Sequence, residues 1–303
     1  MNQSVAIILK FLIYNFIKKS GSGFRQREYY FHSLAAADLS NHFTPISMLQ
    51  PIKISFKPTL LFFSANALSY PLHEMFHALT AYFLNVNATL HHFYVDVDRT
   101  GTSVYDNIVI AVAGPVLSLV FGLLFWVAYK KSKNPSYKLF LFYAAITGIS
   151  IFFGNMFSTA MAGDFHRAAI LLRFPSWLQV MVTLTGLIFL FLFMYRVGKE
   201  VLLLSFSNTT TFKEVIASFL LIPWFLGTLL VILCFLPLPG HFITGIISSS
   251  IFWVIPVVAA VINRRKIKAV EYISATLNYI DIILALFSVL VVRILIPGIR
   301  FAH

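Results

Sequence analysis

The sequence predicts an all-α polytopic membrane protein with about seven transmembrane helices, a small β-hairpin between the first two, and an N-terminal interfacial helix. Three observations predict this fold class. Of the 303 residues, 59% are hydrophobic and only 11% are charged. Apolar runs of about 20 residues, the length that crosses a bilayer as a helix, recur along the chain. Basic residues cluster in the short segments between these runs, as they do in loops that set topology.

The net charge of +12 is interpreted as a topology signal, because the basic clusters alternate with apolar runs. Anionic lipid headgroups are then the expected neighbours of these clusters, and a nucleic-acid partner is not expected. By the positive-inside rule, the side that precedes the first span is cytoplasmic. We expect a multi-pass protein of the plasma membrane of a prokaryote.

The N-terminal segment, residues 1–57, is expected to be cytoplasmic and interfacial. Its apolar run at 5–17 has 13 residues, and a helix of that length rises only ~20 Å, less than the ~30 Å of a hydrocarbon core. Residues 58–172 are predicted to hold three spans and residues 173–303 four more. The seven spans are expected at about 58–84, 106–129, 139–162, 175–195, 214–236, 241–262 and 274–296.

A hairpin is predicted between the first two spans, in the stretch ATLHHFYVDVDRTGTSVY. Leu90, His92, Tyr94 and Asp96 would share one face of an extended strand, because successive side chains alternate. The DRTG sequence at 98–101 is typical of a turn.

The stretch HEMFH, residues 73–77, sets three polar side chains inside an apolar run. In a helix, His73 and His77 lie on one face, where two imidazoles can bind one metal ion, and Glu74 is within reach of a water bound to that ion. Each ionisable residue at the centre of a span costs ~2.5–3.5 kcal/mol, and a bound metal would offset that cost. The structural alternative is a polar staple between spans, in which the two buried histidines bond to neighbouring helices and to Glu74. Pro71 removes a backbone hydrogen bond and can kink this helix.

A catalytic zinc site requires a third protein ligand. Asp164, the one carboxylate in the stretch FFGNMFSTAMAGDFHRAAILL, is the candidate. It can equally be the cap of a helix that continues as AAILL. His166 is the rival ligand, and its alternative interpretation is an interfacial histidine.

Three blocks, in this order, resemble the site-2 protease family of intramembrane zinc metalloproteases. They are HEMFHALTA at 73–81, AGPVLSLVFG at 113–122 and NMFSTAMAGDFHR at 155–167. The resemblance covers roughly residues 58–170. Read without the resemblance, the small residues of the second block indicate close helix packing.

The resemblance implies a role for five residues. His73, His77 and Asp164 would bind Zn²⁺, Glu74 would be the catalytic base, and Asn155 would line the site as an oxyanion or substrate contact. The implied substrate is a membrane protein with a transmembrane segment. The family also implies a cytoplasmic hairpin, whereas the charge distribution places the hairpin outside, so the absolute orientation stays open.

The chain departs from the family pattern around the ligands. Phe76 replaces a glycine, Ser158 replaces a proline, Phe165 replaces a glycine, and one extra residue separates Asn155 from Asp164. Two rival functions follow. One is a zinc-binding membrane protein without proteolytic activity, in which Phe76 and Phe165 block the groove. The other is a transporter whose histidines and carboxylates form an ion path, which would place polar residues in several spans rather than two.

Overall fold

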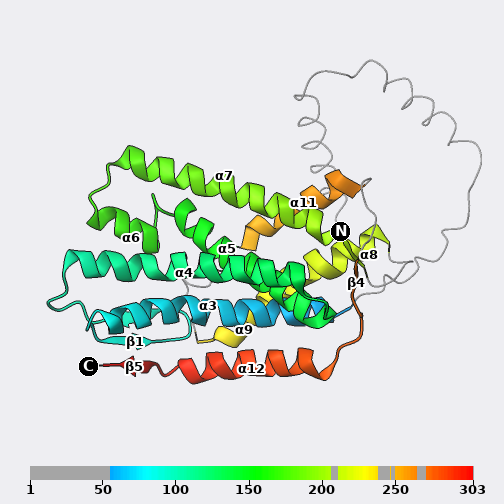
Figure 1. Ribbon diagram of the computed structural model, residues 1–303, viewed down its shortest axis with the longest axis horizontal. Coiled ribbons are helices and arrows are strands. Elements are labelled where there is room, and N and C mark those ends of the chain that lie inside the picture. The colour runs from blue at the N-terminus through cyan, green and yellow to red at the C-terminus, as the bar shows by residue number, and fades with distance from the viewer. Residues whose placement is uncertain (1–54, 206–210, 238–245, 247–249, 265–270, 303) are drawn as a thin grey trace, which may run out of the picture. The chain divides into compact units, whose positions relative to one another are not determined.

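The computed structural model describes residues 55–205, 211–237, 246, 250–264 and 271–302, which form a mostly helical fold with two small sheets (Figure 1). The expected interfacial helix at 5–17 lies outside the described residues. The longer helices are α3 (Lys57–Phe83), α4 (Val104–Lys131), α5 (Pro135–Phe157), α7 (Ser176–Val201) and α12 (Tyr279–Leu295). The shorter helical elements are α6 (Asp164–Leu171), α8 (Phe212–Ile216), η1 (Ala217–Leu221), η2 (Pro223–Gly227), α9 (Thr228–Phe235), η3 (Ile251–Trp253) and α11 (Val254–Asn263).

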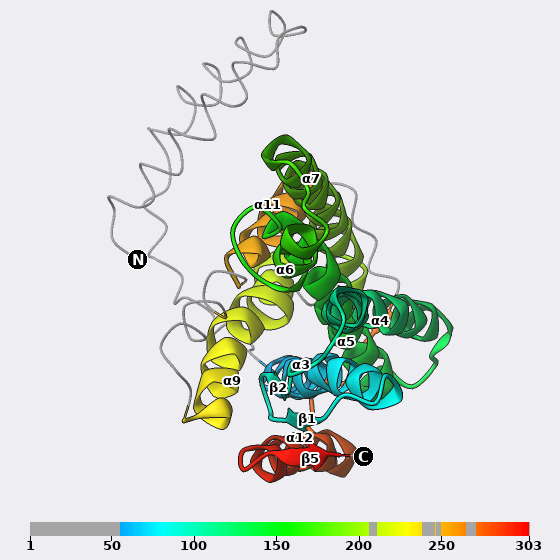
Figure 2. The ribbon, with the colours of Figure 1, turned by 90° about the vertical axis from the view of Figure 1, so that its left-hand side faces the viewer.

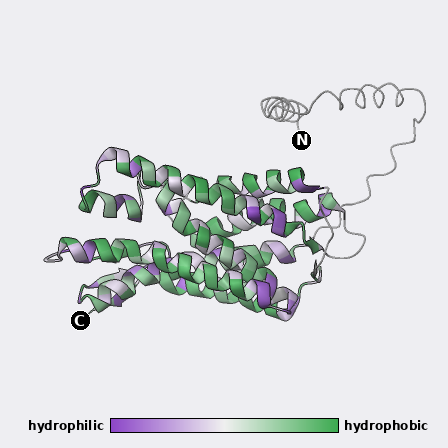
Figure 3. Cartoon of the chain, turned by 45° about the horizontal axis from the view of Figure 1, so that its top comes forward, coloured by the Kyte–Doolittle hydropathy of each residue, from purple (hydrophilic) through white to green (hydrophobic). Residues whose placement is uncertain are grey.

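Among the described residues, four helices are long and apolar enough to cross a membrane, so by length and composition the chain is an integral membrane protein. They are Val104–Lys131, Tyr137–Phe157, Ser176–Val201 and Phe212–Phe235, the last of which joins α8, η1, η2 and α9. Apolar residues run along these helices (Figure 3). On α7, large apolar side chains such as Ile188 and Leu192 are exposed, as expected of a surface that faces lipid.

The structure supports four of the seven expected spans. The helix at the first expected span, α3, has 27 residues, but the polar side chains in its middle lower its hydropathy. At the last expected span, α12 has only 17 residues. At the sixth, the described residues contain a shorter apolar helix, Ile251–Asn263.

The helix α3 is the centre of the described bundle. It packs against α4 and α5 on one side and against α12 on another, as the end-on view shows (Figure 2). Most residues of its first half are buried. Helices that follow residue 173 therefore pack directly on the three-span region predicted at 58–172.

The predicted hairpin is present, and DRTG forms a turn as predicted, but that turn follows β2 and is not the reversal between the two strands. Strand β1 (Ala88–Leu90) pairs antiparallel with β2 (Val95–Val97), with Leu90 opposite Val95. The chain reverses over residues 91–94, where the His91 N–H donates to the Tyr94 carbonyl at 2.9 Å. The prediction that Leu90, His92 and Asp96 share one face of a strand is therefore wrong. The reversal leaves Leu90 and His92 buried while Asp96 is exposed.

Two pairings had no signal in the sequence. Strand β5 (Ile299–Phe301), near the C-terminus, pairs antiparallel with β1, so the sheet order is β2-β1-β5. A second, parallel pair joins β3 (Leu204–Ser205) to β4 (Glu271–Tyr272). Strand β2 pairs only with β1 in the described part of the chain, which leaves its outer edge open.

A buried ion pair joins the beginnings of α3 and α12. Lys57 Nζ lies 3.3 Å from Asp281 Oδ2, and both side chains are almost fully buried. Asp281 also accepts from the backbone N–H of Asn278 at 2.9 Å, as part of the capping box that starts α12. The sequence gives no partner for Asp281, and the structure supplies Lys57.

Replacing Lys57 by methionine is expected to lower the free energy of unfolding by about 3–5 kcal/mol, because the Asp281 carboxylate would stay buried without its cation. Unfolding in mixed detergent micelles, followed by circular dichroism, measures the change. The exposed Lys133→Met variant is the control and should change stability by less than about 0.5 kcal/mol. Equal stabilities of the two variants would contradict a structural role for the pair.

Candidate metal centre

Three ligand atoms from two distant parts of the chain meet at one point. His73 Nε2 and His77 Nε2 are 3.2 Å apart, and Asp164 Oδ2 lies 3.2 Å from the first and 3.5 Å from the second. The histidines are on α3, whereas Asp164 begins α6, 91 residues beyond His73. His73 and His77 therefore lie on one face of α3, as the HExxH spacing predicts. The start of α6 brings Asp164 to that face.

The triangle fits a metal ion. A tetrahedral zinc with bonds of about 2.0–2.1 Å to nitrogen and oxygen separates its ligand atoms by about 3.3 Å, close to the three distances found here. Two imidazole nitrogens and one carboxylate oxygen are also donors that zinc accepts. The group of His73, His77 and Asp164 can therefore hold a metal ion.

Hydrogen bonds on the far side of each imidazole orient the rings. His77 Nδ1 lies 2.6 Å from the Ile110 carbonyl oxygen on α4. A carbonyl only accepts, so Nδ1 carries the proton and, in the neutral ring, Nε2 has its lone pair free for a metal. His73 Nδ1 lies 3.0 Å from the hydroxyl of Ser118, also on α4, and the same tautomer results when Nδ1 donates to that hydroxyl.

The glycine of the Ala-Gly-Pro block, Gly114, lies against the His77 ring. A Cβ on Gly114 would lie 2.2 Å from His77 Nε2, far inside van der Waals contact. The absence of a side chain lets α4 approach α3 closely enough for the imidazole to fit between them. The packing interpretation of this block agrees with the structure, and the residue packed on Gly114 is a candidate ligand.

Asp164 is positioned by the turn that connects α5 to α6. Gly163 has a φ of 93°, a conformation that residues with a Cβ rarely adopt. The side-chain oxygen of Asn155 accepts from the Asp164 N–H at 3.2 Å, while its amide nitrogen donates to the Ile151 carbonyl at 3.0 Å. The carboxylate of Asp164 is thereby directed at the two histidines.

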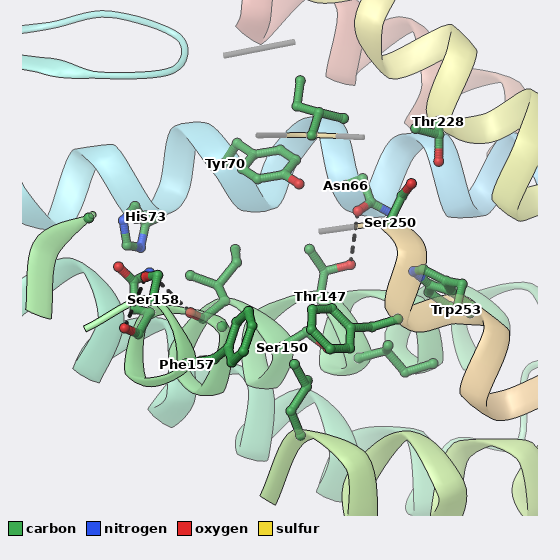
Figure 4. A pocket seen from close by; sticks show the side chains of 18 of the residues that line it. Asn66, Tyr70, His73, Thr147, Ser150, Phe157, Ser158, Thr228, Ser250 and Trp253 are labelled. Atoms are coloured by element: carbon green, nitrogen blue, oxygen red, sulfur yellow. Dashed lines mark hydrogen bonds between the residues drawn. The ribbon is translucent and has the colours of Figure 1, made fainter. Parts of the chain in front are cut away.

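Glu74 and His73 line a cavity of about 700 Å³ to which α3, α5, α7, α9 and η3 contribute side chains. Figure 4 shows His73 at its wall. Glu74 is half-buried, and it follows His73 directly in the helix. Asn155 and Ser158 line the same cavity from α5 and the turn after it. The arrangement places a carboxylate next to a candidate metal group at the wall of a space that can admit another molecule.

Three other residues singled out in the sequence lie elsewhere. Phe76 packs against Phe121, with ring centroids 5.2 Å apart, and Phe165 packs edge-on against Phe152 at 5.5 Å. Neither phenylalanine that departs from the family pattern is among the residues that line the cavity. The rival ligand His166 has its Nδ1 2.8 Å from the Thr159 carbonyl and is not part of the candidate metal group.

Gly114→Ala should weaken zinc binding by at least about tenfold, because the new methyl group would displace the His77 ring and misalign a ligand. Zinc affinity of the purified protein, measured by competition with a chelating dye, tests this expectation. The matched control is Gly154→Ala on α5, where a Cβ would meet no atom within 4 Å and binding should be unchanged. Unaltered affinity in Gly114→Ala would exclude this close packing.

Comparison with protein-family models, with curated proteins and with solved structures found no match to the chain.

Proposed function

We propose that the chain is an intramembrane zinc metalloprotease, which hydrolyses peptide bonds in or beside the transmembrane segments of membrane-protein substrates. The observation that carries the proposal is the meeting of His73, His77 and Asp164, which the HExxH motif and the third sequence block suggested separately. The four membrane-length helices support an intramembrane setting. The cavity beside Glu74 offers space for a substrate.

The proposal also places α3 within the bilayer. Because of its polar residues, α3 is not among the helices that length and composition identify as membrane spans. Nevertheless, α4, α5 and α12 pack around it. Both histidines of the motif are buried. Polar side chains in a membrane protein face the protein interior and bond to partners there, as His73 and His77 do.

Zinc bound to the two histidines and Asp164 would supply a Lewis acid that polarises the scissile carbonyl. Glu74 is assigned the proton transfers. As general base it takes a proton from the attacking water while a C–O bond forms, and as general acid it passes that proton to the leaving nitrogen while the C–N bond breaks. The products are a carboxylic acid and an amine, so the reaction needs only water as co-reactant.

Asn155 is assigned two tasks. Its oxygen holds the N-terminus of α6, and one N–H donates to Ile151. A side-chain amide has two N–H groups, so the second is left for an oxygen of the substrate that gains negative charge in the transition state.

A substrate helix must unwind before its peptide bonds can be attacked, and the unwound backbone then needs hydrogen-bond partners. The open edge of β2 can supply them by strand addition. Across the hairpin, His91 bonds to Tyr94 and Asp98 bonds to Asn87. Backbone groups in an antiparallel ladder point alternately toward and away from the partner strand. The N–H groups of Val95 and Val97 therefore point away from β1, toward the open edge.

The non-proteolytic rival requires Phe76 and Phe165 to block the groove, and their packing away from the cavity lining removes that reason. A transporter would distribute ionisable groups along a path through several spans. In the described residues, the histidines and carboxylates with ligand spacing form one group. These observations favour the protease.

Glu74→Gln should keep zinc but lower cleavage of a membrane-protein substrate by about 10²–10⁴-fold, because the proton acceptor is lost. Asp164→Ala should weaken zinc binding, because a ligand is lost. Metal analysis and a cleavage assay in proteoliposomes, run on the same preparations, separate the two effects. Undiminished cleavage by Glu74→Gln would exclude Glu74 as the base.

Val97→Pro should slow cleavage by about tenfold and leave the zinc content unchanged, because proline removes an outward N–H from the β2 edge without breaking the ladder to β1. The matched control is Val97→Ala, which keeps that N–H. Equal cleavage rates for the two variants would show that the edge does not hold the substrate.

A further inference from the structure

The cavity is much larger than hydrolysis of one peptide bond requires. Its volume of about 700 Å³ extends from His73 and Glu74 to Trp253 (Figure 4). Its walls are mostly apolar, with a few amide and hydroxyl groups among the apolar side chains. The part of the cavity that is remote from the candidate metal group therefore has a role beyond bond cleavage, and the role inferred for it rests on the proposed protease function.

Polar groups face the cavity at helical intervals on both walls. On α3, Tyr70 and Asn66 precede His73 by about one and two turns, and on α5, Thr147 and Ser150 precede Asn155. Asn155 follows Thr147 by eight positions, which span about 12 Å at 1.5 Å per residue. An extended peptide rises about 3.3 Å per residue. The space beyond the metal group therefore matches three or four extended residues.

The hydroxyl of Ser150 is the best placed of these groups to receive a substrate. Its contact in the described structure is the thioether sulfur of Met194, at 3.8 Å, and such sulfur is a weak acceptor. One turn away, the Thr147 hydroxyl and the Asn66 side-chain oxygen are paired at 3.3 Å, as Figure 4 shows. A backbone carbonyl beside Ser150 would be a stronger acceptor than the sulfur.

An aromatic cluster lies at the end of the cavity, where Phe62 and Trp253 line it. Phe62 packs edge-to-face on Tyr143 at 5.4 Å and on Trp253 at 5.1 Å between ring centroids. All three side chains are buried. A peptide that extends from the metal group along α3 and α5 meets Phe62 one helical turn beyond Asn66, with Trp253 beside it, so these rings limit the length of the cavity.

We propose that this cavity is a substrate subsite. It binds three or four extended, apolar residues on one side of the scissile bond, the hydroxyl of Ser150 bonds to their backbone, and Trp253 limits their number. The residues recognised are apolar because the walls are apolar. The subsite would thus select which position of an unwound transmembrane segment is cut.

Leucine oligomers that carry a hydroxamate test the proposal, because the hydroxamate anchors one end of the peptide at the metal. Two series, with the hydroxamate at the carboxyl end or linked through succinyl at the amino end, contain one to six leucines. Binding to the zinc-loaded full chain in nanodiscs is measured by calorimetry, with acetohydroxamate as the reference without a tail. In one series, affinity should rise about three- to tenfold per residue up to three or four residues, and then stay level.

Two variants test the residues. Ser150→Ala should weaken binding of the four-leucine compound by about three- to tenfold and leave acetohydroxamate binding unchanged. Trp253→Ala should move the plateau to longer tails by at least one residue, a change that general loss of packing would not produce. Thr185→Val, on α7 and not among the residues that line the cavity, is the control and should alter neither.

The outcomes distinguish the two proposals. Failure of acetohydroxamate to bind would contradict the zinc centre itself. Binding of acetohydroxamate without any dependence on tail length, or a length dependence that Ser150→Ala and Trp253→Ala leave as in the wild type, would overturn the subsite and leave the zinc centre intact.

Discussion

The contact between the α3 histidines and Asp164 is the constraint on which the rest of the structure depends. Two imidazoles and a carboxylate in an apolar setting must find partners, because water is scarce there. The inner nitrogens of His73 and His77 face Asp164, and the outer ones bond to Ser118 and to the Ile110 carbonyl. The positions of α4 and α6 relative to α3 follow from these bonds.

Close helix packing is the means by which α4 and α5 reach their positions around that contact. Gly114 admits the His77 ring, and farther along α4, Gly122 lies against the backbone at Ile149 of α5, where a Cβ would come within 2.7 Å. Between transmembrane helices, such small residues allow contacts that the hydrophobic effect does not drive. The small residues and the polar ligands therefore act together, since the ligands meet only where the backbones approach.

The sequence predicted what depends on local spacing and missed what depends on distant pairing. The i, i+4 spacing of His73 and His77 was sufficient for a shared face, and the choice of Asp164 over His166 agrees with the geometry. The turn of the hairpin was misplaced, because DRTG is a strong local signal whereas the actual reversal at 91–94 contains no glycine. Neither β5 pairing with β1 nor Lys57 pairing with Asp281 could be found from the sequence, because each joins residues more than 200 positions apart.

Asn155 joins the candidate metal centre to the cavity. Its side chain fixes the start of α6, and so the position of the Asp164 carboxylate, while the same residue lines the space beside Glu74. A molecule that enters the cavity therefore contacts a residue on which the ligand geometry depends. Because α5 is a continuous helix from Pro135 to Phe157, Thr147 and Ser150 have fixed heights relative to Asn155. If the chain is the protease proposed above, recognition along α5 and hydrolysis at its end would share one rigid support, and that support would set the distance between a recognised residue and the scissile bond.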